Sequence, residues 1–89
     1  MEDEYALYSF KDFYLTAFLL CGFAELIKIR DSEDGLYCIF DLRSKVNVEQ
    51  IIRDYYNDRM SINPALHKRK IIDLKSALYE HKKEKAKKK

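Results

Sequence analysis

The sequence predicts an α+β domain with the element order α-β-β-α-α: an N-terminal buried helix, a β-hairpin, two C-terminal helices and a basic tail. Capping patterns mark the helices, and two short runs rich in Ile, Leu, Phe and Tyr lie between them around a turn. The 89 residues are 47% hydrophobic, which suffices for one core but not for two. We expect residues 1–80 to form a single domain and residues 81–89 to form a Lys-rich helix extension or tail.

The N-terminal helix is predicted to begin at Phe10. Ser9 and Asp12 fit the capping-box pattern, in which a hydroxyl and a carboxylate three residues on satisfy amides of the first turn. Gly22 is predicted to end this helix, because glycine is common at helix C-termini. Only three positions between Phe10 and Gly22 are polar. Because a helix that is apolar nearly all round is usually buried, we place this one at the centre of the domain.

A β-hairpin is predicted from residues 23–30 and 36–42, joined by a turn that contains Gly35. Alternation along the second strand assigns Leu36, Cys38, Phe40 and Leu42 to the core and Tyr37, Ile39 and Asp41 to the outer face. A two-stranded ribbon alone is only marginally stable. The hairpin therefore needs the first helix, a third strand from residues 5–8, or the sheet of a partner.

Two further helices are predicted in the C-terminal half. Asn47 and Gln50 form a cap before a run with helical periodicity, which indicates a surface helix with one buried stripe. Asn63 and Pro64 supply an N-cap and a proline at the first helical position of the last helix. Its apolar stripe ends near Tyr79, so we expect the core to end at about residue 80.

The formal net charge of +2 is the sum of two unlike halves. Residues 1–42 contain three basic and nine acidic residues, whereas residues 43–89 contain fourteen basic and six acidic residues. Blocks of like charge often bind polyanions, but they also occur as solvated helix ends. Both interpretations of the C-terminal lysines stay open.

Caps, core positions and a turn are spread over residues 8–79. The positions concerned are Ser9, residues 12–19, Gly22, residues 37–41, residues 55–57 and residues 74–79. In these positions the chain resembles an uncharacterised family, a domain of unknown function in small proteins of bacteria, phages and mobile elements. The resemblance implies a fold and such an origin, but no catalytic residue, and it does not extend to the basic tail.

No catalytic or metal-binding pattern stands out in the sequence. It contains no Gly-rich phosphate loop, no nucleophile elbow and no paired metal ligands at a recognised spacing. We expect Cys21 and Cys38 to be reduced core residues, although a disulfide between them stays open. His67 stands in a basic run, where we expect it to be solvated or to contact phosphate. We therefore expect no enzyme activity, no catalytic residue, no metal and no cofactor.

The first functional hypothesis is nucleic-acid binding. On the last helix, lysines recur every seven residues and fall on one side, which gives a cationic stripe suited to phosphates. Aromatic and basic residues of the hairpin face could stack on the bases of single-stranded DNA or RNA. The candidate residues are Lys68, Arg69, Lys75, Lys82, Lys28, Arg30 and Tyr37.

The second hypothesis is a protein-interaction module, an adaptor or inhibitor of a host or element enzyme. The partly apolar outer face of the hairpin and its free edge could pair with a protein partner or with a second copy in a homodimer. The N-terminus is acidic, and no apolar stretch reaches the roughly 20 residues that span a bilayer. We therefore expect a cytoplasmic protein with no membrane partner.

Overall fold

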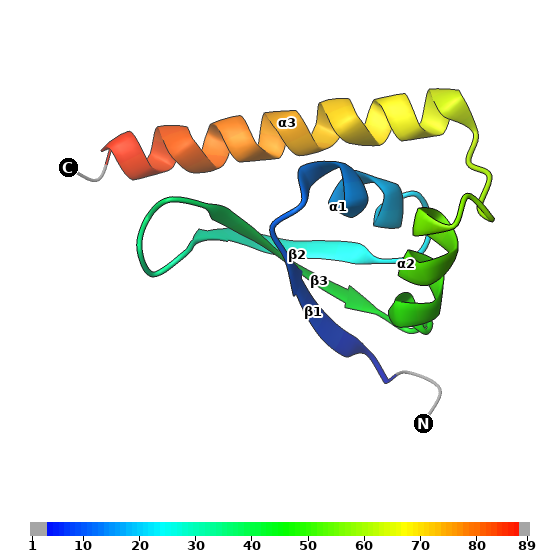
Figure 1. Cartoon of the computed structure of the whole chain (residues 1–89). Helices are drawn as coiled ribbons and strands as arrows, with labels where there is room; N and C mark the ends of the chain where they lie inside the picture. The colour runs from blue at the N-terminus through cyan, green and yellow to red at the C-terminus, as the bar shows by residue number, and fades with distance from the viewer. Residues whose placement is uncertain (1–3, 88–89) are drawn as a thin grey trace.

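The computed structural model describes residues 4–87, with side chains as far as residue 84, as a three-stranded antiparallel sheet and three helices (Figure 1). The elements in chain order are β1 (Ala6–Phe10), α1 (Phe13–Leu19), β2 (Glu25–Asp31), β3 (Cys38–Ser44), α2 (Val48–Tyr56) and α3 (Pro64–Lys87). The α+β class and the order of α1, hairpin, α2 and α3 are confirmed. The strand β1 precedes the predicted elements.

The start of the first helix was predicted wrongly. Ala6–Phe10 form β1, which pairs antiparallel with β3 so that Phe10 lies opposite Phe40. The helix α1 begins at Phe13, and its N-cap is Asp12, whose carboxylate accepts a hydrogen bond from the Leu15 amide at 3.1 Å. Ser9 is a strand residue. Pairing with β3 takes Ser9 into the sheet as part of a third strand, which a two-stranded ribbon needs for stability, so the helix starts from the later cap at Asp12.

The sheet has the strand order β1-β3-β2, so β3 is central and the hairpin gains the third strand that it needs. The helices α1 and α3 lie over the same face of this sheet, and α2 packs at its end (Figure 1). The core lies between the sheet and the helices. Its buried hydrophobic members are Leu15, Ala17, Phe18, Leu19, Phe40, Leu42, Val48 and Leu74.

Residues 32–37 form the hairpin loop, in which Gly35 has a φ of 75°. The core assignment is confirmed for Phe40 and Leu42, which are 2% and 1% exposed. It is wrong for Leu36, which is 76% exposed because β3 begins only at Cys38 and Leu36 belongs to the loop. Gly22 has a φ of 108° just after α1, as its predicted role as a stop requires.

The predicted N-caps of both C-terminal helices are confirmed. The Asn47 side chain accepts a hydrogen bond from the Gln50 amide at 3.2 Å, and the Asn63 side chain accepts from the Ala65 amide at 2.8 Å. The helix α3 then runs without a break from Pro64 to Lys87, so it continues past the predicted end of the core. Of the predicted tail, residues 88–89 lie outside the described residues.

Candidate functional site

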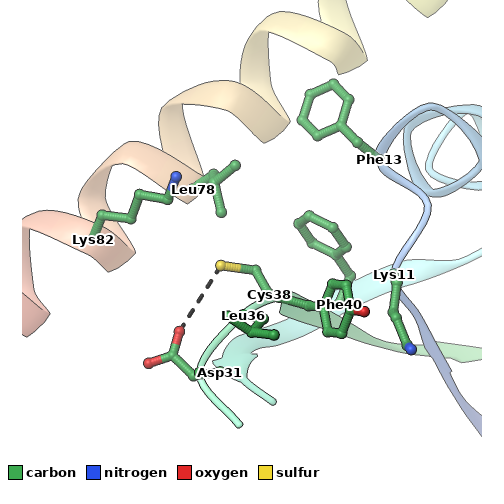
Figure 2. Close-up of a pocket in the computed structure, with 10 residues that line it drawn as sticks. Lys11, Phe13, Asp31, Leu36, Cys38, Phe40, Leu78 and Lys82 are labelled. Atoms are coloured by element: carbon green, nitrogen blue, oxygen red, sulfur yellow. Dashed lines mark hydrogen bonds between the residues drawn. The ribbon is translucent and has the colours of Figure 1, made fainter.

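A pocket of about 460 Å³ lies between the C-terminal half of α3, the hairpin loop and the start of α1 (Figure 2). Its apolar walls come from three separate parts of the chain: Phe13, Leu36, Phe40 and Leu78. Its polar side chains are Lys11, Asp31, Tyr37, Cys38 and Lys82. A pocket with apolar walls and a few converging polar groups is the usual form of a ligand-binding site.

Tyr37 and two lysines form an exposed part of this pocket. Tyr37 is 49% exposed, and Nζ of Lys11 lies 4.4 Å from the centroid of its ring. A cation at this distance is attracted by the face of an aromatic ring. Lys82 borders the same pocket from α3. Tyr37 was predicted to share the outer sheet face with Ile39, whereas it precedes β3 and lines a pocket beside α3.

The predicted lysine stripe lies along one side of α3. Lys68, Lys75 and Lys82 are all exposed. Their spacing of seven residues confines them to a band of roughly 40° around the helix axis. Arg69 is also exposed but is rotated by about 100° from Lys68, away from the stripe.

The acidic residues of α3 lie on another side of the helix. Asp73 borders a hollow against Leu26 of β2, while Glu80 and Glu84 border a second hollow against Lys28 of the same strand. The cations of the stripe are therefore separated from the acids of their own helix. Lys28, in contrast, lies among carboxylates and at a distance from the stripe.

Arg30 lies on the opposite face of the sheet. Its Nε donates to Oδ2 of Asp41 at 2.7 Å, and the Ser9 hydroxyl donates to Oδ1 of the same carboxylate at 2.6 Å. The hydrogen bond from Arg30 is the main cause that lowers the pKa of Asp41. Because Asp41 alternates with the buried Phe40 and Leu42, this ion pair faces away from the helices. The seven predicted binding residues thus do not form one surface.

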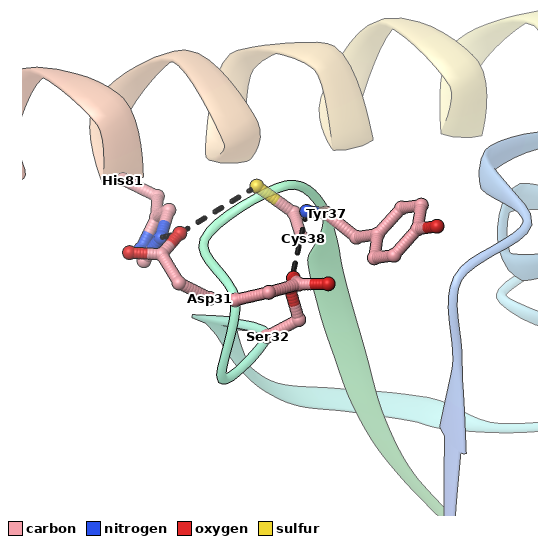
Figure 3. A network of polar contacts seen from close by, with 6 residues as sticks. Asp31, Ser32, Tyr37, Cys38 and His81 are labelled. Atoms are coloured by element: carbon pink, nitrogen blue, oxygen red, sulfur yellow. Dashed lines mark hydrogen bonds and ion pairs between the residues drawn. The ribbon is translucent and has the colours of Figure 1, made fainter.

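Asp31, Cys38 and His81 form a polar cluster at the edge of the pocket (Figure 3). Nε2 of His81 lies 3.1 Å from Oδ1 of Asp31, and the Cys38 sulfur lies 3.9 Å from that oxygen. All three side chains are partly buried, and one ligand atom from each lies within 4.8 Å of the others. In the described part of the chain this is the one group of three or more such residues that could hold a metal ion.

The two cysteines are free thiols in different surroundings. Cys21 is 8% exposed, and burial is the main cause that raises the pKa of its thiol. Its sulfur donates to the Ala17 carbonyl at 3.4 Å. Cys38 is less buried and borders the pocket. Only Cys38 is placed to meet a ligand.

The expectation that His67 is solvated was wrong. Its ring packs edge-on against Phe18, with centroids 6.5 Å apart. Its Nε2 is buried without a hydrogen-bond partner among the described residues. His67 faces the core because it lies two turns before Leu74 on the inward side of α3.

Sequence reasoning missed Lys11 and the Asp31, Cys38 and His81 cluster. The pairing of Asp31 with Cys38 follows from the hairpin register and could have been inferred from the two strand ends. The position of Lys11 depends on β1 pairing with β3, and the position of His81 depends on how α3 crosses the hairpin. No local sequence pattern indicates either of these two positions.

Comparison of the chain with family models, with curated proteins and with solved structures gave no match. The resemblance to an uncharacterised family therefore stays a prediction. Among the residues that the structure describes, no helix combines the length and the apolar character needed to cross a membrane.

Proposed function

We propose that this protein binds single-stranded nucleic acid along α3 and is a binding protein rather than an enzyme. In this proposal Lys68, Lys75 and Lys82 neutralise phosphates, and a base stacks on Tyr37. The observation that carries the proposal is the meeting of Tyr37, Lys11 and Lys82 in one pocket at the C-terminal end of the stripe.

The dimensions of the stripe support contact with several phosphates. Lys68 and Lys82 are separated by about 21 Å along the helix axis, with Lys75 midway between them. Cations in such a row release counterions from a nucleic acid on binding. The resulting contribution to the free energy of binding does not depend on base sequence. The separation of the stripe from Asp73, Glu80 and Glu84 keeps the carboxylates of α3 away from the path. The carboxylate at the end of the path is that of Asp31, in the pocket.

The pocket supports the preference for single strands. Tyr37 is half exposed, and its ring lies at a recess of about 460 Å³ rather than on a flat surface. A base enters such a recess only if it is free of its stack and of its partner base. Stacking on an aromatic side chain tolerates all bases, because every base has a π face. We therefore expect weak sequence preference.

A salt series with fluorescently labelled nucleic acids tests this proposal. Fluorescence anisotropy is measured for single-stranded DNA, single-stranded RNA and duplex DNA of equal length, each from low salt to about 200 mM. We expect affinity to fall linearly with salt on a double-logarithmic plot and single strands to bind more tightly than the duplex. If none of the three nucleic acids binds at about 100 mM salt, the proposal is wrong.

Protein interaction is the alternative function, and the outer sheet face supports it. Leu7 of β1 and Ile27 of β2 are 74% and 47% exposed, and both border one hollow over β3. Both strands are edges of the sheet. Exposed edges and apolar patches favour pairing with another chain.

Sedimentation over a range of protein concentrations tests the alternative for self-association. Leu7→Asp should shift a dimer towards the monomer, whereas Leu36→Asp should not. Leu36 is a matched control because it is equally exposed, at 76%, but lies in the hairpin loop. A monomer at every concentration would exclude the homodimer through the hairpin.

A further inference from the structure

We propose that Asp31, Cys38 and His81 form a binding site for a divalent transition metal, with zinc as the best fit. This inference goes beyond nucleic-acid binding and does not depend on it. It rests on the convergence of three different ligand types from β2, β3 and α3 at one point (Figure 3).

The chemistry of the donor set selects the class of metal. A thiolate, an imidazole and a carboxylate are the three side chains that bind zinc in proteins. Calcium and magnesium prefer oxygen ligands alone, so a site with sulfur and nitrogen excludes them. A bound divalent ion would balance the charges of the Cys38 thiolate and the Asp31 carboxylate, which leaves a neutral centre.

The distances fit a tetrahedral site with little rearrangement. With zinc–sulfur bonds of about 2.3 Å and zinc–nitrogen or zinc–oxygen bonds of about 2.0 Å, neighbouring ligand atoms lie roughly 3.3–3.6 Å apart. The His81 to Asp31 distance of 3.1 Å is slightly shorter, and the Cys38 to Asp31 distance of 3.9 Å is slightly longer. The remaining pair lies within 4.8 Å. Small side-chain rotations suffice to bring all three atoms to one ion.

The backbone holds the ligands before the metal arrives. Asp31 and Cys38 are partners across the β2–β3 register, so their relative position is fixed by the hairpin. His81 is fixed by α3, whose Leu78 packs against the core one turn earlier. A preorganised site of this kind avoids much of the ordering cost of binding.

Asp31 and Cys38 line the pocket and His81 borders the hollow beside Lys28, so a fourth ligand could reach a bound metal from the pocket. Three protein ligands and one open position, filled by water, are typical of zinc sites that meet a further ligand. His81 is followed in sequence by Lys82, and Cys38 is preceded by Tyr37. A bound metal would therefore fasten the helix wall of the pocket to its loop wall.

Metal titration of the full chain tests this inference. The protein is stripped with a chelator under reduction by a non-thiol reductant, titrated with Co²⁺ and then displaced with Zn²⁺. We expect one equivalent to bind, with tetrahedral cobalt absorption in the visible and a thiolate-to-cobalt band in the near ultraviolet. Zinc should also raise the melting temperature, because it binds the folded state.

Variants identify the ligands. Cys38→Ser should abolish the thiolate band, and His81→Gln should weaken zinc binding by more than about tenfold. Cys21→Ser is the matched control, because its hydroxyl can replace the hydrogen bond to Ala17 and it lies outside the cluster. Asp31→Asn is the third ligand variant and should also weaken zinc binding, since it keeps an oxygen acceptor for His81 while it removes the negative charge. Circular dichroism confirms that each variant is folded.

The inference is overturned if the stripped protein binds no Co²⁺ or Zn²⁺ at micromolar concentration. It is equally overturned if Cys38→Ser binds zinc as tightly as the parent, or if Cys21→Ser loses the thiolate band. In the first case the cluster serves only to join α3 to the hairpin by the His81 to Asp31 contact. Nucleic-acid binding measured with and without chelator remains a separate result, so either proposal can fail alone.

Discussion

His81 and Asp31 lie fifty residues apart in the sequence, and Nε2 of His81 approaches Oδ1 of Asp31 to 3.1 Å. This contact joins α3 to the end of β2, beyond Leu78, which among the described side chains is the last apolar one of the helix that packs against the core. It therefore extends the packed part of α3 by about one turn past the apolar stripe. His81, which was predicted to belong to the tail, thus lies against the end of the sheet.

Truncation tests where the domain ends. A chain that stops after His81 should keep the melting temperature of the parent within about 2 °C, because it retains both Leu78 in the core and the His81 contact to Asp31. A chain that stops after Tyr79 loses the His81 contact, so it should lose about 1 kcal/mol, or roughly 4–8 °C. Differential scanning calorimetry of the two chains measures both values. Equal melting temperatures would show that the contact adds nothing to stability.

The N-cap of α1 is open to a direct test. Asp12→Ala removes the acceptor for the Leu15 amide and should cost about 1 kcal/mol, whereas Asp12→Asn should restore most of it because Asn caps helices as well as Asp does. Ser9→Ala should cost less, since it removes only two exposed hydrogen bonds, one donated to Asp41 and a long one accepted from Arg30. Chemical denaturation gives the three values. A larger loss for Ser9→Ala would favour a helix that starts at the earlier cap.

Acidification should lower the stability of the folded protein through protonation of Asp41. Hydrogen bonding to Arg30 and Ser9 lowers the pKa of Asp41 in the folded protein below its unfolded value of about 4. A lowered folded-state pKa stabilises the protein above the unfolded pKa, and this contribution is lost as the pH falls through the folded pKa. The stability difference between the parent and Asp41→Asn should therefore be largest above about pH 5 and should shrink below about pH 4.

The control for this acid titration is Arg30→Gln, which removes the main cause of the shift and leaves the carboxylate in place. Its pH profile should resemble that of Asp41→Asn. Thermal melts at steps of pH from neutral to about 2 give the comparison. If the difference between parent and Asp41→Asn grew as the pH fell, the sign of the proposed linkage would be wrong.

Charge and stacking should leave different signatures in nucleic-acid binding. Lys75→Glu should weaken binding to every strand and flatten the salt slope by about one unit, because one phosphate contact is lost. Tyr37→Ala should cost roughly 1–3 kcal/mol on single strands with little change of slope. Lys28→Glu is the matched control, since it makes the same change of charge beside Glu80 and Glu84. An equal loss for Lys28→Glu would point to a diffuse effect of net charge.

Several elements could be predicted because their signals are local. The caps at Asn47 and Asn63 act on amides two or three residues away, and Gly35 marks a turn closed within the hairpin. The lysine stripe is equally local, because the helix repeat alone places Lys68 and Lys75 on one side. In each case the sequence contains both the residue and its partner within a few positions.

The tertiary structure decided what depends on distant partners. Ser9 and Asp12 are both good caps, and pairing of β1 with β3 decided between them. Arg30 was predicted as a nucleic-acid-binding residue, but it forms an ion pair with Asp41 across the sheet. Asp31, Cys38 and His81 meet only because α3 crosses above the hairpin loop (Figure 1). The sequence determined which side chains are present: a carboxylate, a thiol and an imidazole. The path of α3, which begins at Pro64, determined where they come together. Packing of the helix against a shared core fixes such contacts, and no local pattern encodes them.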